Sequence, residues 1–344
     1  MLLNNDIGID LGTSSVLVYC KNKGIVAQEP SVVTVDENTK EIVAIGEQAR
    51  KMLGKTPTNI VAVRPLREGV VSNFEVTEKM IRYFIDKAIG TDWFKKPTVA
   101  VCVPSRVTDT EKMAVEQATK YAGAGRVHVI EEPVAAALGA GIDITKPCGS
   151  LVVDIGGGTT DIAVISLGGI VISTSVKIAG DNFNDAILTY ISMERDILIG
   201  EGTAENLKVV IGTVSEKTPY AETKVSGINK NTKLPDTITV STEEMYKAMK
   251  KTADDIVEAV IGVLENTPPE LSADILERGI VLTGGGSLLE GISDLIEDRT
   301  GVKCVTADDP VKCVAIGAGK YLEYKEDEPQ QPNFSIKSLF GFWE

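Results

Sequence analysis

The sequence is poor in the residues and segments on which several classes of function depend. One histidine, His128, occurs among 344 residues, which excludes a histidine base or a multi-histidine metal site; we expect a structural role for it. The five cysteines are odd in number and widely spaced, so they fit neither a disulfide framework nor a zinc site, and we expect them to be small core residues. No apolar run reaches about 18 residues, which excludes a membrane-spanning helix.

Positive charge is also scarce. Lys and Arg number 35 against 49 Asp and Glu, so the net charge is −14 and we expect no strong affinity for nucleic acid. Residues 1–6 contain no basic region and no long apolar segment, which predicts the absence of a secretory signal and a cytoplasmic location. Apolar residues are plentiful at 43%, enough for a folded protein of two or three domains.

An internal repeat indicates how the chain is organised. Residues 7–19 and 151–164 each contain an apolar strand, an aspartate, a glycine turn with hydroxyl side chains, and a second apolar strand. The aspartates are Asp10 and Asp154. Glycine supplies the positive φ that a tight hairpin turn needs, and β-branched residues beside it favour strands. The repeat predicts two similar mixed-sheet α/β domains, and residues 33–66 and 181–249 each contain a segment that looks inserted.

Several helix starts are predicted from capping residues. Thr77 precedes a helical stripe of apolar residues and is expected to cap it. Residues 108–111 and 241–244 are capping boxes. A helix of small residues is predicted over 134–141.

Three glycine-rich turns carry the chemistry of the sequence. They occupy residues 10–15, 154–160 and 283–287, each directly after an apolar strand. One such turn is typical of an ordinary hairpin, but three of them, two with an aspartate at the same offset, favour phosphate binding by exposed backbone N–H groups. Two aspartates at the ends of buried strands suit a hydrated Mg²⁺ on a nucleotide phosphate. A Walker sequence is absent, and no dinucleotide fingerprint follows the first strand.

Together these motifs resemble the actin, Hsp70 and sugar-kinase ATPase superfamily and, within it, the bacterial actins of the MreB and Mbl type. The similarity runs from Asp6 to about Leu322. Further ordered matches are residues 29–33, 64–66, 101–105, 130–134, 165–170, 267–271 and 279–286.

The resemblance implies an actin-like ATPase fold, with two α/β domains around a nucleotide cleft and a small inserted subdomain in each. Its divisions would be subdomain IA at 1–32, 67–144 and 308–324, IB at 33–66, IIA at 145–180 and 250–307, IIB at 181–249, and a flexible linker with a hydrophobic tail at 325–344.

The resemblance also implies roles for individual residues. Asp10 and Asp154 would hold Mg²⁺ through water, and Glu132 would position and polarise the attacking water, helped by Thr159 or Thr160. The sequence alone does not exclude the alternative that Glu132 is a solvated carboxylate at a helix start, favoured there by the helix dipole. Without the resemblance, the pair Glu205 and Lys208 would be a surface ion pair rather than an adenine clamp. The implied nucleotide-binding residues are Gly12, Thr13, Ser14, Gly156, Gly157, Gly158, Gly180, Glu205, Lys208, Gly284, Gly285 and Gly286.

The chain departs from the family pattern at three places. The first turn reads Thr-Ser-Ser at 13–15 where Thr-Ala-Asn is usual, and Asp161 stands where a glutamate is usual, so turnover is expected to differ. Residues 217–236 depart most, which leaves the strength of polymerisation open.

Two apolar segments predict contact with a membrane. Trp93 and Phe94 lie beside two lysines, a composition that suits a bilayer interface as well as core packing; the resemblance favours a membrane-inserting loop. The tail is too short to span a bilayer, and we expect a second anchor or a peptide that docks on a partner. Its apolar residues include Leu339, Phe340, Phe342 and Trp343.

The function expected from the resemblance is that of an actin-like protein that binds ATP and Mg²⁺, hydrolyses ATP slowly and contributes to cell shape. Its partners would be itself, in filaments of paired protofilaments, the inner face of the cytoplasmic membrane, and other cell-shape proteins. The alternative is a small-molecule kinase or phosphatase of the same superfamily. An Hsp70-type chaperone would need a peptide-binding domain beyond residue 322.

Overall fold

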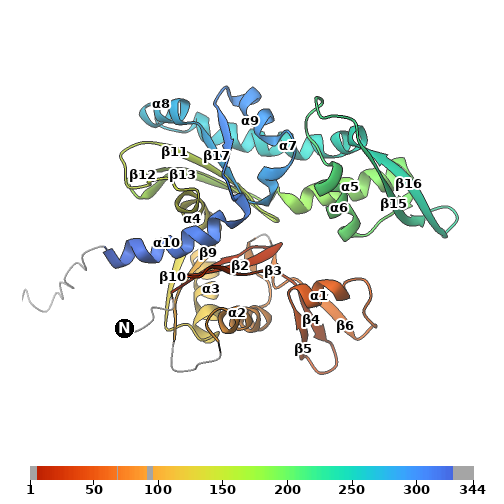
Figure 1. Ribbon diagram of the computed structural model, residues 1–344, viewed down its shortest axis with the longest axis horizontal. Helices are drawn as coiled ribbons and strands as arrows, with labels where there is room; N and C mark the ends of the chain where they lie inside the picture. The colour runs from red at the N-terminus through yellow and green to blue at the C-terminus, as the bar shows by residue number, and fades with distance from the viewer. Residues whose placement is uncertain (1–5, 68, 91–95, 328–344) are drawn as a thin grey trace, which may run out of the picture.

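Two five-stranded mixed sheets form the centre of the structure, a computed structural model that describes residues 6–67, 69–90 and 96–327 (Figure 1). The first sheet has the order β10-β9-β1-β2-β3 and the second the order β13-β12-β11-β17-β18. The strands of the first are β1 (Ile7–Leu11), β2 (Ser15–Cys20), β3 (Gly24–Pro30), β9 (Thr98–Val103) and β10 (Arg126–Glu131). Those of the second are β11 (Ser150–Ile155), β12 (Thr160–Ser166), β13 (Gly169–Val176), β17 (Ile280–Thr283) and β18 (Cys304–Thr306).

The predicted repeat appears as one equivalent hairpin in each sheet. β1 pairs antiparallel with β2 and parallel with β9, and β11 pairs antiparallel with β12 and parallel with β17. Strands covered on both faces need apolar side chains on both faces, and β1, β2, β11 and β12 are almost entirely buried. The carboxyl ends of β1 and β11 carry Asp10 and Asp154 to the space between the sheets.

Helices cover the outer faces of both sheets. α2 (Phe74–Ile89) and α3 (Asp109–Tyr121) pack on the first sheet, and their buried side chains form one core with β1 and β9. α5 (Gly180–Glu194), α7 (Thr242–Glu265), α8 (Pro269–Arg278) and α9 (Ile292–Thr300) surround the second.

Two helices of small residues lie between the sheets. α4 (Glu132–Gly139) packs against α10 (Cys313–Asp327), and their core includes Cys102 of the first sheet and Ala163 of the second. The two helices touch through their backbones, because a Cβ atom on Gly317 would lie 1.7 Å from the carbonyl oxygen of Ala135. α10 also packs on β1 and β9, although it lies at the far end of the chain.

Two small sheets project from the larger ones. β4 (Val33–Asp36), β5 (Ile42–Ile45) and β6 (Ile60–Val63) form one with α1 (Glu47–Met52); β14 (Ile197–Leu198), β15 (Glu222–Asn229) and β16 (Pro235–Ser241) form the other beside α6 (Glu201–Ile211). Both lie at the same end of the molecule in Figure 1. β7 (Leu66–Arg67) pairs with β8 (Val70–Val71) between the first small sheet and α2.

The predicted helix starts are partly confirmed. The capping boxes of Thr108 and Ser241 are present. The assignment of Thr77 as a cap is wrong: Asn73 caps α2, its side chain accepting a hydrogen bond of 3.1 Å from the N–H of Val76. Thr77 lies in the first turn and its hydroxyl donates to the carbonyl of Asn73 at 2.7 Å. The helix predicted over 134–141 begins earlier, at Glu132.

The rare side chains are only partly where they were expected. Three cysteines are buried, but Cys148 and Cys304 are half-buried, so the core prediction is wrong for these two. His128 is half-buried in β10, with its ring 6.4 Å from that of Tyr321. Among the described residues, no helix is both long and apolar enough to cross a bilayer.

Candidate functional site

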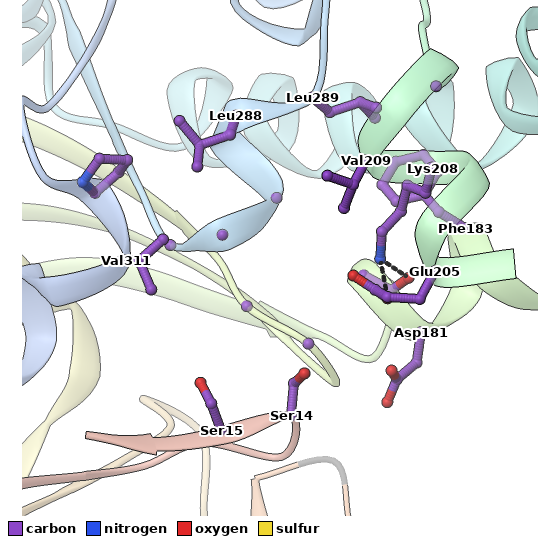
Figure 2. Close-up of a pocket in the computed structure, with 18 of the residues that line it drawn as sticks. Ser14, Ser15, Asp181, Phe183, Glu205, Lys208, Val209, Leu288, Leu289 and Val311 are labelled. Atoms are coloured by element: carbon purple, nitrogen blue, oxygen red, sulfur yellow. Dashed lines mark hydrogen bonds and ion pairs between the residues drawn. The ribbon is translucent and has the colours of Figure 1, made fainter. Parts of the chain in front are cut away.

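A cavity of about 740 Å³ opens between the two sheets, and residues from both line it (Figure 2). The three glycine-rich turns converge here. One joins β1 to β2, one joins β11 to β12, and the third follows β17. The third turn enters a short 3₁₀ helix, η1 (Gly285–Leu288), rather than an α-helix.

The turns approach one another so closely that glycine is required. A Cβ atom on Gly157 would lie 2.5 Å from the Cβ of Ser14, and one on Gly158 would lie 2.7 Å from the hydroxyl of Thr13. Gly284 has φ of +78° and stands against Ile155, whose carbonyl oxygen would be 2.3 Å from a Cβ. The turns therefore present backbone rather than side chains to the cavity, which suits phosphate oxygens.

The two aspartates are buried close to other carboxylates, and both conditions disfavour their charged forms. Burial, followed by the charge of Asp154, raises the pKa of Asp10 to about 8. Burial also raises the pKa of Asp154 to about 7, although the hydroxyl of Thr283 donates to this carboxylate at 2.6 Å. Carboxylates in this condition are stabilised by a cation. No group of three or more His, Cys, Asp or Glu side chains in the described part of the chain is placed to hold a metal ion by itself, so a metal here would take most of its ligands from water and a bound anion.

Glu132 is buried at the first residue of α4, with only 8% of its surface exposed, so it is not a solvated carboxylate at a helix start. Burial raises its pKa well above the usual range, and the charges of Asp161, Asp10 and Asp154 add to the effect in that order. Glu132 lines the same cavity as the two aspartates, so its carboxyl group can contact a water molecule there.

The two adjacent threonines differ in position. Thr159 lines the cavity, whereas Thr160 is fully buried and its hydroxyl donates to the carbonyl of Ile178 at 2.7 Å. Of the predicted catalytic, nucleotide-binding and metal-binding residues, Thr160 alone does not line the cavity. Thr283, the first residue of the third turn, was given no role of its own in the sequence analysis; its hydroxyl holds Asp154 from the neighbouring strand β17.

Besides the glycine turns and the acids, the cavity is lined by apolar side chains and by one ion pair. The Nζ of Lys208 donates to Glu205 at 2.8 Å and to the carbonyl of Gly180 at 3.0 Å, and the Lys208 side chain is only 15% exposed (Figure 2). Lys208 and Glu205 therefore form part of the cavity wall. The apolar residues that line the cavity were not predicted and include Phe183, Val209, Leu288, Leu289 and Val311.

All the predicted glycines, Thr13, Ser14, Glu205, Lys208 and both aspartates line the cavity. The predicted membrane residues Trp93, Phe94, Leu339, Phe340, Phe342 and Trp343 lie outside the described residues.

The fold is shared with solved actin-like structures. MreB5 of Spiroplasma citri, in a crystal structure with AMPPNP, is 38% identical with a TM-score of 0.89, covering 95% of this chain and 98% of that chain. A MamK double helical filament, 22% identical with a TM-score of 0.78 over 94% of this chain and 100% of that chain, has the same fold. The two repeated sheets around one cavity are thus an actin-like fold.

Sequence comparison narrows this class. The pattern of the MreB/Mbl protein family matches residues 4–330. The cell shape-determining protein Mbl of Bacillus cereus is 50% identical over 326 residues, covering 95% of this chain and 98% of that protein. The cell shape-determining protein MreB of Escherichia coli K12 is 46% identical over 328 residues, 94% of each. The chain belongs to the MreB/Mbl family of bacterial actins, and a kinase or phosphatase is not favoured.

Proposed function

We propose that this chain binds Mg-ATP in the cavity, hydrolyses it slowly, and assembles into membrane-associated filaments that contribute to cell shape. The convergence of three glycine turns and two aspartates from both halves of the chain carries the proposal. Support comes from the nucleotides, AMPPNP and ADP, in the structures of the Spiroplasma relative, and from the cell-shape names of the Mbl and MreB relatives.

Asp10 and Asp154 would hold Mg²⁺ through water. The raised pKa of both carboxylates fits a cation, and Lys208, a cationic side chain in the cavity lining, is already bonded to Glu205. Bound to the phosphates, Mg²⁺ would neutralise charge that develops during phosphoryl transfer.

The rest of the nucleotide has a complementary wall to contact. Backbone N–H groups of the first two turns would hold the β and γ phosphates, and the third turn would lie beside the nucleoside. The apolar side chains that line the cavity would bury the base, as apolar walls with a few polar groups do in small-molecule sites.

Glu132 would act on water. A water molecule that donates a hydrogen bond to its side chain would be held for attack, with the hydroxyl of Thr159 nearby. The water oxygen would then bond to the γ-phosphorus while the bond from that phosphorus to the bridging oxygen breaks, which would release ADP and phosphate; one proton of the water would stay on the phosphate and the other would pass to solvent. Both residues act by position and polarity, which carry most of phosphoryl transfer.

Filament formation is tested by sedimentation and electron microscopy of the pure full-length protein with Mg-ATP, with Mg-ADP and without nucleotide. We expect filaments whose amount depends on the nucleotide. A protein that binds ATP but stays monomeric in all three conditions would overturn the filament role.

Membrane binding rests on the composition of the two apolar segments. Replacing both Trp93 and Phe94 by alanine should weaken co-sedimentation with liposomes. Full binding by this variant, lost on removal of residues 334–344, would place the anchor in the tail instead.

A further inference from the structure

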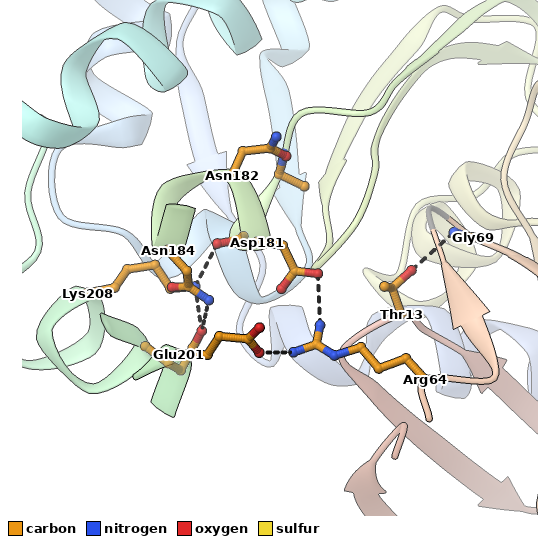
Figure 3. Close-up of polar contacts among 11 residues, drawn as sticks. Thr13, Arg64, Gly69, Asp181, Asn182, Asn184, Glu201 and Lys208 are labelled. Carbon is orange, nitrogen blue, oxygen red and sulfur yellow. Dashed lines mark hydrogen bonds and ion pairs between the residues drawn. The ribbon is translucent and has the colours of Figure 1, made fainter. Parts of the chain in front are cut away.

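One arginine joins the two halves of the molecule at the edge of the cavity. Arg64 follows β6, and its guanidinium contacts Asp181 at 3.2 Å and Glu201 at 3.1 Å (Figure 3). Asp181 is the second residue of α5 and lines the cavity; Glu201 is the first residue of α6. The cation therefore belongs to the half that contains the first sheet, and both carboxylates belong to the other half.

Asp181 is hydrogen-bonded through its backbone to the second glycine-rich turn, residues 154–160; this turn and the first one, residues 10–15, are called the phosphate turns below. The backbone N–H of Asp181 donates to the carbonyl of Gly157 at 2.7 Å, and that of Gly180 donates to the carbonyl of Gly156 at 3.0 Å. The backbone of Asp181 is therefore held to the second glycine-rich turn. A movement of α5 and this turn away from the first half would separate Asp181 from Arg64.

The basic end is attached to the first phosphate turn. The hydroxyl of Ser72 donates to the carbonyls of Arg64 and Pro65 at 3.0 and 2.9 Å, which fixes the backbone that carries the guanidinium. The N–H of Gly69, in the same segment, donates to the hydroxyl of Thr13 at 3.1 Å (Figure 3). Residues of the segment 64–72 thus contact both phosphate turns, one directly and one through Asp181.

The three charged side chains of this contact are partly exposed to solvent, so the ion pairs are weak. The side chains of Arg64 and Asp181 are 36% and 34% exposed, and that of Glu201 is 72% exposed. Ion pairs at this exposure contribute modestly and weaken with salt, while the planar guanidinium can hold two carboxylates at once. Such a contact suits a fastening that is made and broken in each nucleotide cycle.

We infer that Arg64 is a positioning residue that fastens the two halves of the molecule across the cavity and slows release of the bound nucleotide. The inference rests on the proposed nucleotide site and concerns its regulation. The rate of nucleotide release is controlled by an ion pair that makes no contact with the phosphates.

The test measures release of fluorescent N-methylanthraniloyl-ADP, loaded with Mg²⁺ onto the full-length protein and chased with unlabelled ADP. Arg64→Gln keeps much of the side-chain length but removes the charge, and we expect release about fivefold faster with a smaller change in the association rate. High salt should speed release from the parent protein and have little effect on the variant. Equal release rates for parent and variant would overturn the inference.

Arg299→Gln is the matched control. Arg299 also contacts two carboxylates, Asp254 and Glu258, at similar exposure, but all three lie on α7 and α9 within one half. Its removal should leave the release rate unchanged. An equal acceleration in this control would show a general effect of lost surface charge and would overturn the inference.

Glu201→Gln provides a second variant if Arg64→Gln folds poorly. It should speed release by a smaller factor, and combined with Arg64→Gln it should add little, because the two changes remove the same contact. Fully multiplicative effects of the two changes would overturn the inference. Failure of the parent protein to bind the labelled nucleotide would instead overturn the proposed function, and the inference with it.

Discussion

The β1–β2 hairpin and the β11–β12 hairpin are copies of one pattern whose cross-strand partners differ. In the first, Asp10 lies opposite the apolar Leu17; in the second, Asp154 lies opposite Asp161. Asp161 is fully buried, and it accepts hydrogen bonds from the N–H and hydroxyl of Ser105 at 2.8 and 3.0 Å. Ser105 follows β9 of the opposite sheet, so only the second hairpin has this bond to the other half.

This difference shows that a repeated motif can serve two purposes. Both hairpins present an aspartate and a glycine turn to the cavity. The second also places a buried acid near Glu132, since the charge of Asp161 follows burial as the next cause of the raised pKa of Glu132. We therefore expect equal roles for the hairpins in binding the cation and unequal roles in stability.

The largest effect is expected where both hairpins act on one group. Glu132→Gln should lower the rate of phosphate release about 100-fold or more, because it replaces the acid that we propose positions water. ATP binding should change little. Glu131→Gln is the control: Glu131 is the neighbouring residue and pairs with Lys112 at 3.0 Å instead of lining the cavity. Unchanged turnover in Glu132→Gln would remove this residue from the mechanism.

The aspartates test whether the two hairpins bind the cation equally. Asp10→Asn and Asp154→Asn should each weaken Mg-ATP binding about 10-fold or more, since each removes one of the two carboxylates that we propose hold the hydrated ion. Calorimetric titration with and without Mg²⁺ gives both affinities. A loss confined to one variant would break the symmetry that the comparison assumes.

The unequal part is tested by giving the second hairpin the partner of the first. Asp161→Leu leaves the N–H and hydroxyl of the half-buried Ser105 without their acceptor, and we expect a loss of about 1–3 kcal/mol in the free energy of unfolding. Urea denaturation measures it. Ser105→Ala added to Asp161→Leu should recover part of the loss. An unchanged free energy of unfolding in Asp161→Leu would show that the hydrogen bonds between Ser105 and Asp161 do not stabilise the protein.

The smallest effect is a pH dependence of the metal-free protein. The pKa of Asp10 is raised from 3.8 to about 8 and that of Asp154 from 3.8 to about 7, so the folded state binds protons more tightly than the unfolded state. The preference of the folded state for the protonated forms stabilises it fully below about pH 4. This stabilisation is lost progressively as the pH rises from about 4 through 7 and 8. The melting temperature should fall by a few degrees over this interval. Asp10→Asn should remove the later part of the fall; a flat profile in the unmodified protein would contradict the raised values.

The hairpins and most of the cavity residues were predictable because their signals are local. A glycine turn with an aspartate after an apolar strand occupies fewer than about ten residues, and β-branched strands beside it need no distant information. The family resemblance then indicated which turns face each other. The apolar wall of the cavity had no such local signal.

Contacts between distant segments could not be predicted in this way. Thr283 lies 129 residues from Asp154, Ser105 lies 56 from Asp161, and Arg64 lies 117 from Asp181. The incorrect cap had a local cause. Asn73 and Thr77 are both capping residues four positions apart, so they lie on the same face of the helix, and the apolar pattern fits either start. The membrane segments stay predictions.

The position of α10 has a consequence for synthesis of the protein. This helix covers β1 and β9 of the first half, but it is made after the whole second half. At ribosomal rates of about 5–20 residues per second, the first sheet waits roughly 10–40 s for its cover. Until then, the core that includes Ala100 and Cys102 lacks the residues that α10 contributes to it. The half that emerges first is thus the last to be completed, and the nascent chain has a period in which chaperone binding or aggregation competes with folding.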